Sequence, residues 1–150
     1  MARTTGRKPY KILIFCSRGE GYSGDVATAI RNALVGPPHS KLREKPDYKL
    51  AVGRNRIHLM LRGYGEWAKS HRPLRVSDIK KAALIISSID IPDELAPGLI
   101  TERQVLDALR HANTHERKVV HSDFVYGNPA TLKRRILERA RRTRRPHRAL

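Results

Sequence analysis

The sequence contains a largely apolar run, Lys11-Ile12-Leu13-Ile14-Phe15-Cys16, which ends in the only cysteine of the chain. A glycine-rich stretch follows from Ser17 to Gly24, and a helical pattern extends from Asp25 to Leu34. This order predicts a buried strand, a loop and a helix. The N–H groups of such a loop and of the first helical turn converge on an anion. We therefore expect an anion-binding loop above the Cys16 thiol, formed by Ser17, Arg18, Gly19, Gly21 and Tyr22.

Predicted strands and helices alternate along the rest of the chain. Further strands are expected at 48–52, 83–89 and 118–124, and further helices at 54–61, 77–80, 102–112 and from Pro129 onward. Four strands separated by helices predict an α/β fold of three layers, in which helices cover both faces of a mostly parallel sheet. Ligands of such sheets bind beyond the carboxyl ends of the strands, where Cys16 stands.

The charge of the chain predicts attraction to polyanions. Lys and Arg exceed Asp and Glu to give a net charge of +17, and nine basic residues with one acid lie between Lys133 and Arg148. We expect a basic N-terminal arm at 1–9, one domain at 10–140 and a disordered basic tail at 141–150. The tail residues expected to contact RNA, DNA or an acidic protein surface, without sequence specificity, are Arg141, Arg142, Arg144, Arg145 and Arg148.

A single cysteine excludes an internal disulfide, and Cys16 is either a packed apolar residue or a reactive thiolate. The sequence shows no membrane span and no signal peptide, so a cytoplasmic location is expected. His111 and His115 are spaced to share a helix face but lack an evident third metal ligand. No metal or cofactor is therefore expected.

Several local strings resemble segments of the low-molecular-weight phosphotyrosine phosphatases. These strings are Lys11 to Cys16, Arg62-Gly63-Tyr64 followed by His71-Arg72, Val76 to Ile86, and Lys118 to Gly127. The resemblance covers most of residues 10–140. It implies a four-stranded parallel sheet in the phosphatase or flavodoxin-like order, and a phosphorylated protein or small anion as ligand. It also implies that Cys16 is the nucleophile and that Ser23 supports its thiolate, whereas the residue pattern alone also allows Ser23 to be a helix N-cap.

The sequence departs from the family pattern at two positions that have catalytic roles in the family. Tyr22 stands where the family has its phosphate-binding arginine, and Asn128 before Pro129 stands where the family has its general-acid aspartate. General acid catalysis contributes about 10²–10⁴-fold, and arginine is the usual clamp for phosphoryl oxygens. Hydrolysis of phosphate monoesters is therefore expected to be weak or lost, unless Arg18 folds back over the bound anion.

Two alternatives stay open. Cys16-Ser17, Gly19 and Ser23 also resemble the cysteine loops of the IIB components of the sugar phosphotransferase system, which carry phosphate on cysteine. The chain is alternatively a non-catalytic adaptor that binds polyanions through its arginine-rich C-terminus.

Overall fold

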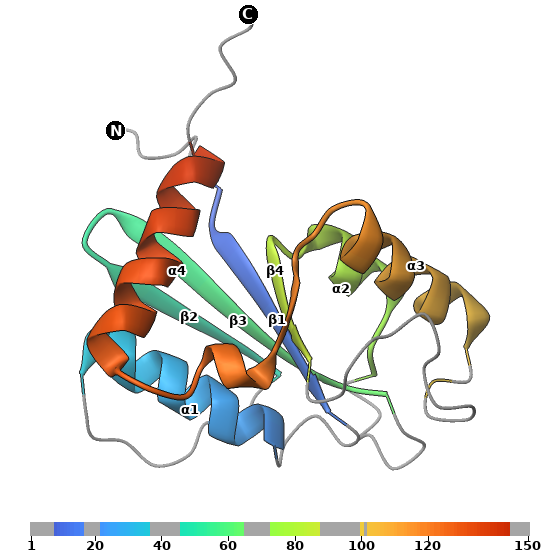
Figure 1. Cartoon of the computed structure of the whole chain (residues 1–150), viewed down its shortest axis with the longest axis horizontal. Helices are drawn as coiled ribbons and strands as arrows, with labels where there is room; N and C mark the ends of the chain where they lie inside the picture. Colours follow the sequence, from blue (N-terminus) through green and yellow to red (C-terminus); the bar gives the residue numbers. More distant parts are fainter. Residues whose placement is uncertain are drawn as a thin grey trace, which may run out of the picture.

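The computed structural model describes residues 8–16, 22–36, 46–64, 73–87, 100 and 102–144 (Figure 1). The elements in chain order are β1 (Tyr10–Cys16), α1 (Tyr22–Val35), β2 (Asp47–Val52), β3 (Asn55–Gly63), α2 (Val76–Lys81), β4 (Leu84–Ser87), α3 (Arg103–Thr114), β5 (Val119–His121), the 3-10 turn η2 (Ser122–Phe124) and α4 (Pro129–Arg144). None of the described helices is long and apolar enough to cross a membrane.

The strands form one five-stranded sheet in the order β2-β3-β1-β4-β5. β1 pairs in parallel with β3 and β4, and β4 pairs in parallel with β5. β2 lies at the edge and runs antiparallel to β3. The predicted α/β class and mostly parallel sheet are confirmed, whereas the expectation of four strands is wrong because the sheet has a fifth strand.

The additional strand is β3, which occupies the segment predicted to be a helix at 54–61. Ile57, Leu59 and Leu61 are fully buried on one face of the sheet, while His58, Met60 and Arg62 alternate with them and point to the other face, as the period of two residues in a strand requires. Gly53 has a φ of +63°, so the chain can reverse in a tight turn between β2 and β3. Val52 and Asn55 then face each other as the first pair of the hairpin.

Helices cover both faces of the sheet (Figure 1). α1 and α4 pack on one face through Val26, Ile30 and Ile136, and α2 and α3 pack on the other through Ile79 and Leu109. β1 is central and contributes to both clusters, because its alternate residues point to opposite faces. The sheet is therefore the middle of three layers, and its carboxyl edge carries the end of β1.

Several predicted boundaries shift. α1 begins at Tyr22 instead of Asp25, and β5 ends at His121, so the last residues of the predicted strand 118–124 form η2 instead. α4 starts at Pro129 as predicted and continues to Arg144, which places the first residues of the predicted disordered tail in a helix. Residues 145–150, with Arg145 and Arg148, lie outside the described residues.

Candidate functional site

Cys16 is the last residue of β1, and the first turn of α1 lies next to its side chain. The backbone N–H of Ser23 donates to Cys16 Sγ over 3.4 Å, and both residues are buried. The first N–H groups of a helix have no acceptor within the helix, and here the sulfur accepts one of them. Such a donor, together with the positive end of the helix, favours the thiolate form of a cysteine.

The hydroxyl group of Ser23 does not make this contact. Its Oγ donates to the Ile14 carbonyl over 3.4 Å, so the main chain of Ser23 is what meets the thiol. The alternative that Ser23 is the N-cap is wrong, because α1 begins one residue earlier, at Tyr22. The structure thus brings Ser23 and Cys16 together through the main chain of Ser23 and not through its hydroxyl group.

Tyr64 follows β3 and stands beside Cys16. Its N–H donates to the Cys16 carbonyl over 3.0 Å, and its ring meets Phe15 edge to face with centroids 6.0 Å apart. Burial raises the pKa of the Tyr64 hydroxyl, and the negative charge of the Cys16 thiolate raises it further. The phenol therefore keeps its proton at neutral pH and is a donor available to an anion near the sulfur.

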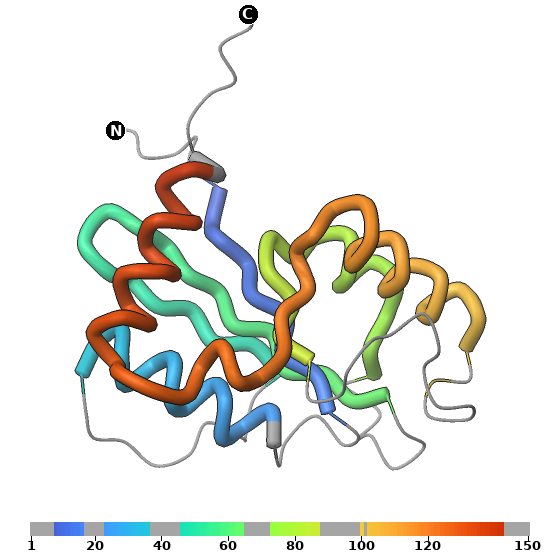
Figure 2. The backbone as a smooth tube through the Cα atoms, in the orientation of Figure 1, coloured from blue at the N-terminus to red at the C-terminus, as the bar shows by residue number. Residues whose placement is uncertain are grey.

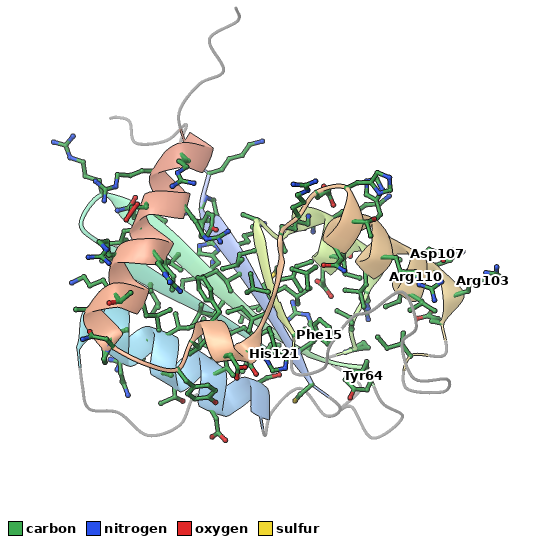
Figure 3. The ribbon with its side chains drawn as sticks, viewed as in Figure 1. Phe15, Tyr64, Arg103, Asp107, Arg110 and His121 are labelled. Atoms are coloured by element: carbon green, nitrogen blue, oxygen red, sulfur yellow. The ribbon has the colours of Figure 1, made fainter. Side chains whose placement is uncertain are left out.

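The other predicted loop residues cannot be placed. Ser17, Arg18, Gly19 and Gly21 lie outside the described residues, and of Tyr22 only the backbone position at the start of α1 is described. On α3, Arg103 and Arg110 lie with Asp107, apart from the group of Phe15, Tyr64 and His121 at the carboxyl edge (Figure 3). These two arginines therefore lie apart from the place where the family resemblance predicts a phosphate-binding arginine.

Sequence reasoning missed His121 and Asp123. His121 ends β5, and Asp123 follows it in η2, so both lie at the carboxyl edge that also carries Cys16. His121 Nδ1 accepts the Asp123 N–H over 3.3 Å and lies 3.5 Å from the Asp123 carboxylate, which is well exposed. The sequence predicted one strand over 118–124, so Asp123 was assigned to the strand and not to the segment that follows it. The feature that could have identified Asp123 is that it is the first carboxylate after the last strand of the sheet.

Asn128 has a structural role. Its Oδ1 accepts the N–H groups of Ala130 and Thr131 over 2.8 and 3.4 Å, which is the hydrogen bonding of a helix N-cap. In Figure 1, the first turn of α4 lies toward the end of α1 that is remote from Cys16. The residue that the family resemblance places at the general-acid position is thus the N-cap of α4 in this structure.

The described residues hold no group of three or more side chains suited to a metal ion. His111 lies in the last turn of α3 and His115 is the C-cap of this helix, and their rings stack with centroids 4.7 Å apart.

No family model, curated protein or solved structure matches the chain.

Proposed function

We propose that the chain is a protein related to the low-molecular-weight phosphotyrosine phosphatases that binds a phosphate or a similar oxyanion beside Cys16, with weak or no hydrolysis. The observation that carries this proposal is the Ser23 N–H on Cys16 Sγ at the first turn of α1. The strand order supports it too, because the four parallel strands, numbered in chain order, lie 2-1-3-4 across the sheet. Flavodoxin-like sheets begin in the same order.

The remaining hydrolysis of a phosphate monoester proceeds in two steps. The Cys16 thiolate attacks phosphorus, the bond from phosphorus to the leaving oxygen breaks, and that oxygen takes a proton from Asp123. Water then attacks the cysteinyl phosphate, gives a proton to the Asp123 carboxylate and releases phosphate with the thiolate restored. Without a guanidinium at position 22, the developing charge on the phosphoryl oxygens loses its usual clamp, which is why turnover is slow.

Alkylation of Cys16 tests the binding proposal directly. The chain has one cysteine, so the rate of reaction with iodoacetamide reports on this site alone. Phosphate, arsenate or vanadate in the loop should slow the reaction in a saturable way, whereas chloride at the same ionic strength should not. An unreactive thiol in the folded protein, or equal rates in all these salts, contradicts the proposal. Turnover of an aryl phosphate by wild type and Cys16→Ser then decides how much hydrolysis remains.

A second candidate function is the binding of polyanions through α4. The buried side of this helix consists of Leu132, Ile136 and Ala140, and its basic side chains lie on the other sides. Arg135 and Arg139 lie over the Phe124 ring, 5.7 and 5.4 Å from its centroid. The helix therefore presents an ordered row of cations to a partner.

Replacing Arg141 and Arg142 by Gln tests this candidate, because both side chains are exposed and the core residue Ala140 is kept. If both arginines neutralise phosphates of a nucleic acid, the slope of log affinity against log salt concentration should fall in magnitude by about 2. The control is Lys80→Gln with Arg103→Gln, which removes the same charge from exposed positions of other helices. If the slope of log affinity against log salt concentration falls equally in both variants, binding depends on the net charge and not on α4.

A further inference from the structure

A groove lies on the face of the sheet that α2 and α3 cover only in part. These helices pack over β1 and β4 on this face, whereas Asp47, Lys49 and Ala51 of the edge strand β2 are exposed there. The groove encloses about 340 Å³, a volume at the lower end of small-molecule sites. Its charged and ionisable lining consists of the basic residues Lys11, Lys49, Arg62 and Lys81, the carboxylates Asp47 and Asp78, His58 and Tyr48.

Three of these residues form a row across adjacent strands. His58 of β3 stands opposite Lys49 of β2 and opposite Lys11 of β1. Neighbouring strands are about 5 Å apart, so a lysine lies on each side of the imidazole. Lys81, the last residue of α2, adds a third ammonium group to the lining.

Arg62 makes the floor of the groove rigid. Its guanidinium donates to the Pro46 carbonyl over 2.7 Å and to Asp47 Oδ1 over 2.9 Å, and its Nε donates to Asp78 Oδ2 over 3.2 Å. These bonds hold the start of β2 and the first turn of α2 against β3. They also engage both carboxylates of the lining, Asp47 and Asp78. Among the described residues, no ion pair involves Lys11, Lys49 or Lys81.

The groups around His58 make the groove electropositive. Burial lowers the pKa of its imidazole, and the positive charges of Lys49, Arg56 and Lys11 lower it further against a small opposing effect of Asp47. The ring is therefore mostly neutral at pH 7. An anion between the lysines would offset their charges and make protonation of the ring favourable.

We propose that this groove binds a phosphate group, carried by a mononucleotide or by a nucleic-acid strand, through Lys11, Lys49 and Lys81 around His58. Lysine ammonium groups bind phosphate as point charges, and the ring of His58 beside Met60 offers a surface for a base to stack on. Lys11 lies near the start of β1 and points to the opposite face from Cys16, so this site is separate from the thiol. The proposal does not depend on the phosphatase-like function.

The binding test uses the full chain and NMR signals of the His58 imidazole, assigned with His58→Gln. The probes are inorganic phosphate, adenosine monophosphate and an oligonucleotide without terminal phosphates, each at about 0.15 M salt.

Lys49→Gln should weaken binding of the preferred probe about tenfold. Arg103→Gln removes the same charge from an exposed position of α3 and should change little. A preference for the first two probes identifies a terminal phosphate, and a preference for the third identifies a strand. His58 signals that no probe shifts, or equal weakening by both variants, overturn the proposal.

The pH dependence gives a second test, with the oligonucleotide as probe because phosphodiesters keep a constant charge in this range. Binding should raise the pKa of His58, so affinity should increase as the pH falls from about 8 to about 6, and His58→Gln should remove that increase. The charged groups around the ring that contribute to its pKa or line the groove are Lys11 of β1, Asp47 and Lys49 of β2, Arg56 and Arg62 of β3, and Asp78 and Lys81 of α2. The same increase in His58→Gln contradicts the proposal. Cys16→Ser should leave both tests unchanged, which separates their failure from failure of the thiol site.

Discussion

The backbone and the side chain of Ser23 make different hydrogen bonds, so substitutions can test the two groups separately. The N–H meets Cys16 Sγ, and the Oγ meets the Ile14 carbonyl. We predict that Ser23→Ala lowers the free energy of unfolding by about 1 kcal/mol and leaves the alkylation rate of Cys16 nearly unchanged. Ser23→Pro should slow alkylation at neutral pH, because it removes the N–H in the first helical turn, where proline is tolerated. Circular dichroism checks that both variants fold. Equal slowing in the two variants would mean that the hydroxyl supports the thiolate.

Asp123 and Asn128 differ in what they can do for a leaving group. Asp123 is an exposed acid directly after β5, and Asn128 is fixed to the first N–H groups of α4. We predict that Asp123→Asn lowers Cys16-dependent turnover of an aryl phosphate by about 10²-fold. Asn128→Asp should bring no gain and little change in stability, because both residues cap helices well. A higher turnover in Asn128→Asp would return the general-acid role to position 128.

Among the elements, β2, β3 and α2 are joined by one side chain, Arg62. A lysine has one nitrogen and cannot reach Pro46, Asp47 and Asp78 together as the guanidinium does. We predict that Arg62→Lys lowers the free energy of unfolding by about 2 kcal/mol, measured by urea denaturation. Arg54→Lys, in the exposed turn before β3, is the matched control and should have almost no effect. Similar losses in both variants would show that the bonds of Arg62 contribute little.

How much of the fold the sequence predicts depends on how distinct each hydrophobic pattern is. The run at Lys11–Cys16 is unambiguous and marks β1, whose buried residues contribute to both core clusters. In β3, Ile57, Met60 and Leu61 match a helix, whereas Ile57, Leu59 and Leu61 match a strand. Pairing with β1, which is distant in sequence, and the hairpin turn at Gly53 together decide between them. At the candidate site, the strand, loop and helix pattern predicted that Cys16 and the start of α1 lie close together, whereas the position of Asp123 depended on where β5 ends.

At the scale of the whole molecule, the thiol and the two ends of the described chain lie at opposite ends of the sheet. Cys16, Tyr64 and His121 lie at the carboxyl edge, whereas the chain enters β1 and leaves α4 at the opposite end (Figure 2). Burial raises the pKa of Tyr10 at the start of β1, and the charges of Arg139 and Arg142 on α4 partly oppose this. The two described ends of the chain are therefore neighbours. The basic segments that extend from them therefore begin at the same end of the fold, opposite the end that carries Cys16.

The net charge of +17 has a consequence for the stability of the whole molecule. Like charges on a compact surface repel one another more than in the expanded unfolded chain, and salt screens this repulsion. We predict that raising sodium chloride from about 0.02 to about 0.3 M increases stability by about 1 kcal/mol, or about 3 °C in Tm for a domain of this size. Phosphate at the same ionic strength should raise Tm further, because a ligand that binds only the folded state stabilises it. Scanning calorimetry measures both effects. Lys49→Gln should remove part of the excess due to phosphate, whereas Cys16→Ser should not lower it, because this change replaces a negatively charged thiolate by a neutral hydroxyl. A Tm that depends on ionic strength alone would contradict binding of phosphate at either site.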